Sequence, residues 1–198
     1  MNSLAAERLL LVDFIIEASP MPVKTASAIA ERFYHVQLNK GDFLLKEGSV
    51  SNEYLFVTDG FMRSFAMDPD GNDITTGFYG QKQVVFEVSS FFHRIPSREN
   101  IQVLTPGAGL AITYATLNEL FHALPEFREF GRSILVRGFS NLKSRMLSTI
   151  TETAEARYLQ LLQTSPDIFY HAPLRTVASF LGITDTSLSR IRKEISGK

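Results

Sequence analysis

The chain has 198 residues, of which 44% are hydrophobic and 21% are charged, and its net charge is −1. This balance predicts a folded protein with one large or two small domains and excludes a globally disordered chain. The absence of cysteine excludes disulfides, thiolate zinc sites and cysteine-bound iron–sulfur clusters. Charged residues interrupt the apolar N-terminal run, and no apolar stretch reaches the ~18 residues of a membrane span. We therefore expect a cytoplasmic protein without a membrane partner.

The first 115 residues combine two expected helices with a run of short strands. Residues 3–35 have helical periodicity, with Leu9 and Leu10 in the apolar stripe of the first helix and a break at Pro20 and Pro22, which predicts a pair of packing helices. From about Val36 the hydrophobic period changes from 3.6 to 2, and turn residues separate the apolar runs. Many short strands with regular turns predict an antiparallel jelly-roll or β-roll barrel, and with the helices an α+β fold. Glycines punctuate this region at Gly41, Gly48, Gly60, Gly71, Gly80 and Gly107.

A long amphipathic helix is expected within residues 116–150. Apolar residues from Phe127 to Ile150 mostly recur at steps of three or four, and Gly131 and Gly138 lie seven residues apart on one face. Two glycines in register indicate that the backbone of another element approaches closely. Such a helix either covers the barrel or joins two chains. Because its length of about 25 residues exceeds what a small barrel needs, we favour a dimer interface.

Residues 151–198 are expected to form a small helical domain. Within it, PLRTVASFLGITDTSLSRIRKEI (173–195) contains two short amphipathic segments around Gly182. Gly182 suits the end of the first helix, and Thr184 suits the start of the second. Leu188, Ile191 and Ile195 would pack inward. Two helices joined by such a turn, with a polar and cationic second helix, are typical of a helix-turn-helix.

The second helix of this pair carries residue types that suit the major groove of DNA. Short hydroxyl side chains let its backbone approach the bases, and Arg190 can bridge guanine O6 and N7. Asp185 can accept from cytosine N4, whereas Arg192 and Lys193 suit phosphates. Residues 171–198 carry five basic and two acidic side chains, a net charge of +3. Two ordinary exposed helices are the alternative. The candidate DNA-binding residues are Thr184, Asp185, Thr186, Ser187, Ser189, Arg190, Arg192 and Lys193.

Three segments of the chain resemble the Crp/Fnr family of bacterial transcription regulators: LNKGDFLLKEGSVSNEYLFVTDGFMRSF (38–65), PSRENIQVLTPGAGLAIT (96–113) and VASFLGITDTSLSRIRK (177–193). The resemblance covers nearly the whole chain. It implies a cyclic-nucleotide-binding-like β-roll sensor domain over 1–115, a dimerisation region over 116–150 and a DNA-binding domain over 151–198. It also implies a homodimer on a two-fold symmetric DNA site, with a small-molecule effector and RNA polymerase as further partners.

The effector site departs from the pattern of the family. FEVSSFFHRIPSRENIQ (86–102) stands where the family has its phosphate-binding segment. Glu87 matches the family glutamate, but Phe86 replaces a glycine and Ser97 occupies the arginine position, with Arg98 one residue late. In a strand, that shift sends the side chain to the opposite face. Leu142 and Lys143 replace the hydroxyl residues that meet the purine. We therefore expect an effector other than cyclic AMP, or none. The candidate pocket residues are Phe86, Glu87, Ser97, Arg98, Leu142 and Lys143.

Two other functions stay open at this point. A cupin-like barrel that binds or converts a small molecule would use the terminal helices for assembly. A metal-dependent cupin needs near-adjacent histidines, whereas the four histidines here are 29 or more residues apart. We therefore expect no catalytic residues, metal site or cofactor. The other alternative is a dimeric regulator that has lost its effector.

Overall fold

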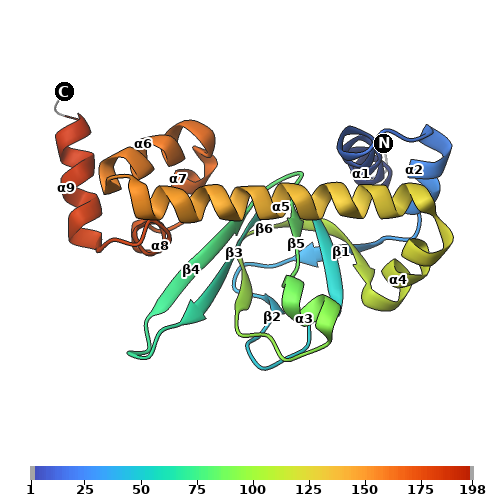
Figure 1. Cartoon of the computed structure of the whole chain (residues 1–198), viewed down its shortest axis with the longest axis horizontal. Coiled ribbons are helices and arrows are strands. Elements are labelled where there is room, and N and C mark those ends of the chain that lie inside the picture. The colour runs from blue at the N-terminus through green and yellow to red at the C-terminus, as the bar shows by residue number, and fades with distance from the viewer. Residues whose placement is uncertain (1–2, 197–198) are drawn as a thin grey trace.

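A computed structural model describes residues 3–196. It confirms the predicted α+β class, with helices at both ends of the chain and strands between them (Figure 1). Residues 1, 2, 197 and 198, which belong to the predicted domains 1–115 and 151–198, lie outside the described residues. The elements in chain order are α1 (Ser3–Ala18), α2 (Val23–Ala30), β1 (Tyr34–Leu38), β2 (Phe43–Leu45), β3 (Glu53–Met67), β4 (Asp73–Tyr79), β5 (Val84–Val85), α3 (Val88–His93), β6 (Asn100–Thr113), α4 (Tyr114–Ala123), α5 (Pro125–Thr151), α6 (Ala154–Thr164), α7 (Asp167–His171), α8 (Leu174–Phe180) and α9 (Asp185–Ser196).

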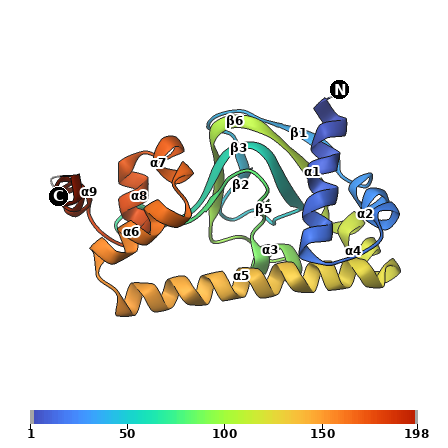
Figure 2. The same cartoon turned by 90° about the horizontal axis from the view of Figure 1, so that it is seen from above.

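The strands form one six-stranded antiparallel sheet in the order β1-β6-β3-β4, with β2 also paired to β6 and β5 to β3. The long strands β3 and β6 pair from Glu53–Thr113 to Phe65–Asn100, and their register shifts between Val57 and Met62. Such irregularities bend and twist a strand pair, so the sheet curls into the roll visible beside α5 in Figure 2. Because β1 and β4 remain edges, the predicted barrel is an open roll.

Two hydrophobic cores lie on opposite sides of the sheet. Neighbouring residues of a strand face opposite sides, so Leu55 lies inside the roll and Phe56 lies under the helices, both fully buried. The outer core joins the roll to α1, α4 and the first turns of α5 through aromatic contacts such as Phe14–Phe56, with ring centroids 5.0 Å apart. Burial of these large side chains supplies most of the driving force for folding.

Helix α1 is buried over a broader face than its sequence pattern predicts. The sequence places Leu9 and Leu10 in its apolar stripe, but Leu9 is 55% exposed, while Leu11 and Val12 are buried. The cause is that α1 contacts α2 as well as α5, β3 and β6. The predicted break at Pro20 and Pro22 is confirmed, because both prolines lie between α1 and α2.

Helix α5 is the long axis of the molecule. It has 27 residues, and its first turns are buried through Phe127 and Phe130. Helices α1, α2 and α4 gather at its N-terminal end, whereas α6 to α9 gather at its C-terminal end (Figure 1). The roll lies along one side of α5, and a second side of the helix is exposed.

The two glycines of α5 have different surroundings, which gives a matched pair of substitutions. A Cβ at Gly131 would lie 2.4 Å from Cε1 of Phe121, whereas a Cβ at Gly138 meets nothing within 4 Å in the protomer. The expected close backbone approach is therefore not found within the described part of the protomer: the side chain of Phe121 lies against Gly131, and Gly138 has no neighbour.

We expect Gly131→Ala to destabilise the protein by about 1–3 kcal/mol through overpacking. Gly138→Ala should instead be neutral or stabilise by up to about 1 kcal/mol, because alanine is the better helix former. Urea unfolding of both variants measures the difference. Equal stabilities of the two variants would show that the ring of Phe121 moves aside without an energetic cost, and would contradict the expectation.

Candidate nucleic-acid interface

The turn between α8 and α9 has the hydrogen bonds of a glycine-terminated helix end. Gly182 has φ +68°, which glycine adopts without steric cost. The N–H of Ile183 donates to the carbonyl of Ala178, and the N–H of Gly182 donates to that of Ser179, each at 3.0 Å. This pair of bonds is the Schellman arrangement. It confirms the role predicted for Gly182 and sets the angle between the two helices.

Thr184 caps the start of α9. Its Oγ1 accepts from the backbone N–H of Ser187 at 3.2 Å and lies 2.9 Å from the hydroxyls of Thr186 and Ser187. The predicted N-cap is therefore confirmed. On the inner side of α9, Leu188 and Ile191 are buried in the core of the terminal helices. These contacts fix which face of α9 points to solvent.

The outer face of α9 carries the predicted DNA-binding residues. The half-buried Ser187 lies at the edge of this face. The side chain of Arg190 is 76% exposed and lies 3.9 Å from the carboxylate of Glu194. An exposed pair of this kind contributes only a few tenths of a kcal/mol, so the guanidinium is available to a partner. The exposed candidates are Thr184, Asp185, Thr186, Ser189, Arg190, Arg192 and Lys193.

The exposed side of α5 is apolar over four turns. The side chain of Phe139 is 68% exposed, that of Leu142 is 64% exposed and that of Ile150 is 71% exposed. A continuous exposed apolar patch on a folded protein marks an interaction surface. We call this patch the α5 stripe, and it consists of Leu135, Val136, Phe139, Leu142, Met146, Leu147 and Ile150.

The six predicted pocket residues do not converge on one cavity within the protomer. Phe86 lines a small apolar cavity beneath α4 and α5, with its ring centroid 5.0 Å from that of Tyr54. Both Leu142 and Lys143 are exposed, with Leu142 in the α5 stripe. The physical reason is that this part of α5 turns its apolar side away from the roll.

Three other predicted pocket residues, Glu87, Ser97 and Arg98, differ in their contacts and do not form one binding site. The carboxylate of Glu87 accepts from the backbone N–H groups of Ser89 and Ser90, at 3.1 and 2.6 Å, and so caps α3. Ser97 is buried, and its hydroxyl bonds the backbone of Glu99. Arg98 is exposed, and it lies in the bend between α3 and β6, so the predicted strand position is wrong for this residue.

The roll contains a polar cluster that the sequence analysis missed. Thr76 donates to the hydroxyl of Ser64 at 2.8 Å, and Ser64 lies 3.2 Å from the hydroxyl of Tyr79. Burial raises the pKa of Tyr79. Burial also raises the pKa of Glu99, with a further contribution from Glu87, while the nearby hydroxyl of Thr76 and the charge of Arg145 oppose it. Nothing in the pattern PSREN distinguishes the half-buried Glu99 from the exposed Arg98 beside it.

The raised pKa of Glu99 implies a pH-dependent stability. The folded state holds the proton more tightly than the unfolded state, so stability falls as pH rises through the folded pKa. Glu99→Gln should therefore be more stable than the original protein at pH 7. Below the unfolded pKa of about 4.3 the difference should vanish. Because the side chain is half-buried, solvent screening limits the gain to less than about 1 kcal/mol.

Urea unfolding at pH 7 and pH 4 measures this difference. The matched control is Glu17→Gln, which changes an exposed carboxylate on α1. A lower stability of Glu99→Gln at pH 7 would show that the charge of Glu99 supports the roll, and would contradict the expectation.

Among residues 3–196, no group of three histidine, aspartate or glutamate side chains is placed to hold a metal ion. The helices in the same part of the chain are too short or too polar to cross a bilayer.

Comparison with known proteins identifies the central domain. Residues 35–123 match the cyclic nucleotide-binding domain family. This segment contains the strands of the roll together with α3 and α4. A search among curated proteins found no sequence match.

Solved structures resemble the whole architecture. FixK2 from Bradyrhizobium japonicum is 16% identical, with a TM-score of 0.71 over 83% of this chain and 85% of that one. The cyclic di-GMP-responsive global regulator CLP of Xanthomonas campestris is 15% identical, with a TM-score of 0.70 over 89% of this chain and 92% of that one. A protein from Eubacterium rectale described as a Crp/Fnr family transcriptional regulator is 13% identical, with a TM-score of 0.69 over 89% of this chain and 84% of that one. The chain therefore has the fold of these Crp/Fnr-type regulators, and residues 35–123 match the cyclic nucleotide-binding domain family.

Proposed function

We propose that the chain is a homodimeric, sequence-specific DNA-binding transcription regulator that acts in the cytoplasm. The observation that carries this proposal is the outer face of α9, where hydroxyls and the guanidinium of Arg190 are exposed above a buried apolar side. In this proposal, α8 and α9 form a helix-turn-helix within the domain 151–198. Arg190 and Ser189 contact bases, Asp185 and Thr186 assist them, and Arg192 and Lys193 bind phosphates.

The proposed dimer forms through the α5 stripe. A second copy of the chain presents the same apolar surface, so two stripes can bury each other about a two-fold axis. The mostly three- and four-residue spacing of the stripe suits packing of one helix against another. The same axis would relate the two α9 helices, which matches a two-fold symmetric DNA site.

The proposed effector, if the roll (1–115) takes one, is not cyclic AMP. Three observations support this view: Glu87 caps α3, Ser97 bonds the backbone of Glu99, and Arg98 is exposed. The cluster of Glu99, Tyr79 and Ser64 offers hydrogen bonds and a carboxylate inside the roll. A carboxylate disfavours a phosphate anion at this place.

Selection from a pool of random DNA duplexes tests the proposed function. The full chain is incubated with the pool alone, with cyclic AMP and with cyclic di-GMP, and bound duplexes are amplified and sequenced. We expect one enriched two-fold symmetric sequence, unchanged by cyclic AMP. Recovery of no enriched sequence under any of the three conditions would overturn the proposal.

A further inference from the structure

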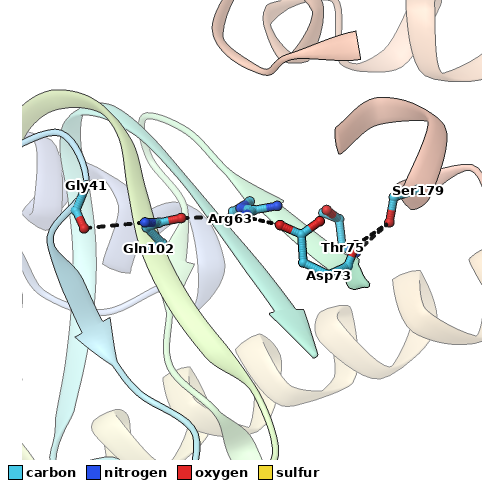
Figure 3. A network of polar contacts seen from close by, with 6 residues as sticks. All are labelled: Gly41, Arg63, Asp73, Thr75, Gln102 and Ser179. Atoms are coloured by element: carbon cyan, nitrogen blue, oxygen red, sulfur yellow. Dashed lines mark hydrogen bonds and ion pairs between the residues drawn. The ribbon is translucent and has the colours of Figure 1, made fainter. Parts of the chain in front are cut away.

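Helix α8 is hydrogen-bonded to the edge of the sheet. Strand β4 lies at that edge, where backbone groups lack a neighbouring strand. The N–H of Thr75 donates to Oγ of Ser179 at 2.9 Å, and Ser179 Oγ donates to the carbonyl of Asp73 at 3.2 Å (Figure 3). Ser179 belongs to α8, the first helix of the proposed DNA-binding pair. It therefore forms hydrogen bonds with two backbone groups at the edge of the roll.

The bonds at Ser179 continue into the sheet. The carboxylate of Asp73 accepts from the guanidinium of Arg63 at 2.7 Å, and Arg63 also reaches Gln102 of β6 at 3.5 Å (Figure 3). The side chain of Arg63 is 10% exposed, and its guanidinium lies 4.1 Å from the ring centroid of Phe65. A partly buried, charged hydrogen bond of this kind favours one position of Asp73.

Arg145 makes a second connection, from α5. Its guanidinium donates to the carbonyl of Thr76 in β4 and to the carbonyl of Phe180 in α8, the latter at 3.3 Å. It also lies 4.0 Å from the ring centroid of Phe180. Burial lowers the pKa of Arg145, but a guanidinium remains charged in proteins. Three elements, α5, β4 and α8, thus meet at one side chain.

Aromatic side chains also join the roll to the terminal helices. The ring centroid of Phe78 in β4 lies 5.0 Å from that of Phe180, and Phe61 in β3 stacks on His171 at 5.1 Å. Tertiary contacts of α8 are therefore divided between its own helical domain and the roll. Because α8 is short and is packed against both the helical domain and β4, few other orientations are open to it.

We infer that Arg145 and Ser179 form a clamp that fixes the α8–α9 pair in one orientation relative to α5. This inference rests on the proposed function. The clamp leaves the outer face of α9 uncovered, so it orients the DNA-binding surface and does not block it. In a dimer joined along α5, two clamped pairs hold the α9 helices at one separation, ready for one spacing of half-sites.

The test uses the full chain with Arg145→Lys and Ser179→Ala. Lysine keeps the charge of Arg145 but loses the planar fork that reaches two carbonyls. The matched control is Arg137→Lys, which makes the same change at an exposed position of α5. Affinity is measured for the selected two-fold duplex, for a duplex with one half-site and for duplexes with one or two base pairs added between the half-sites.

Both clamp variants should bind the two-fold duplex more weakly, whereas binding to the single half-site should be unchanged. If about one molecule in ten retains the correct orientation, the apparent affinity falls about tenfold. Discrimination between half-site spacings should also weaken. Unchanged affinity for all duplexes would overturn the clamp, and so would tighter binding, because the contacts would then oppose DNA binding.

A second measurement needs no DNA and separates the clamp from the proposed function. In Ser179→Ala, amide hydrogen exchange across Asp73–Tyr79 should accelerate, because the N–H of Thr75 loses its acceptor. Exchange in β6 serves as the internal reference. If selection recovers no DNA sequence, the proposed function fails while this measurement still decides the clamp. Unchanged exchange in β4 would overturn the clamp whatever the selection yields.

Discussion

Leu142→Asp should convert the protein from a dimer to a monomer. The side chain of Leu142 is 64% exposed in the protomer and lies near the middle of the α5 stripe, so the protomer should fold normally. In the dimer, two aspartates would be buried close to each other without partners. An unpaired buried charge costs about 3–5 kcal/mol, so dimer dissociation should increase more than 100-fold. Sedimentation velocity over a range of concentrations measures the change.

The matched control for Leu142→Asp is Ser144→Asp. It places the same charge on the same helix, at an exposed position about 200° around the axis from Leu142. Ser144→Asp should remain dimeric, and circular dichroism should show the same fold for both variants. A dimer of unchanged affinity in Leu142→Asp would show that the stripe is not the interface. Loss of the dimer in both variants would show that an added negative charge on α5 disrupts the dimer wherever it is placed.

Arg190→Ala should remove base discrimination in each half-site. A bidentate arginine–guanine contact contributes about 1–3 kcal/mol of discrimination, which corresponds to roughly 5- to 150-fold in affinity for each half-site. Because Arg190 is exposed and its pair with Glu194 is long, the variant should be as stable as the original protein. Binding to the selected duplex and to a shuffled duplex, measured at one salt concentration, gives the ratio that should fall.

Lys193→Ala provides the comparison for Arg190→Ala. A phosphate contact positions the helix without reading sequence, so this variant should weaken binding to both duplexes by similar factors. The slope of log affinity against log salt should also decrease by about one for each lost contact. Equal losses on selected and shuffled duplexes for Arg190→Ala would contradict its role in base recognition.

The sequence predicts the fold well where local chemistry decides the structure. Proline breaks, the change of hydrophobic period and the glycine turns locate α1, α2, the long strands and α5. The sequence does not predict β5, α3 or α7, which have two, six and five residues. Elements this short depend on tertiary contacts, such as the pairing of Leu55 with Val85.

The candidate interface follows from the sequence more completely than the candidate pocket. Gly182, Thr184 and the buried Leu188 and Ile191 are close in the chain, so helical spacing determines which face is outward. The pocket depends on how α5 lies against the roll. No local pattern shows that Leu142 faces solvent while Arg145, three residues later, reaches β4 and α8. Sequence periodicity places residues on a helix but leaves open which surface that helix meets.

Hydroxyl-radical footprinting of the protein on its selected duplex tests the central claim most directly, namely that two α9 helices enter successive major grooves of one DNA site. We expect two protected segments related by two-fold symmetry, with the half-site centres separated by about 10–10.5 base pairs or a multiple of that distance. A single protected segment, or protection of one short region that does not change with Arg190→Ala, would contradict the claim.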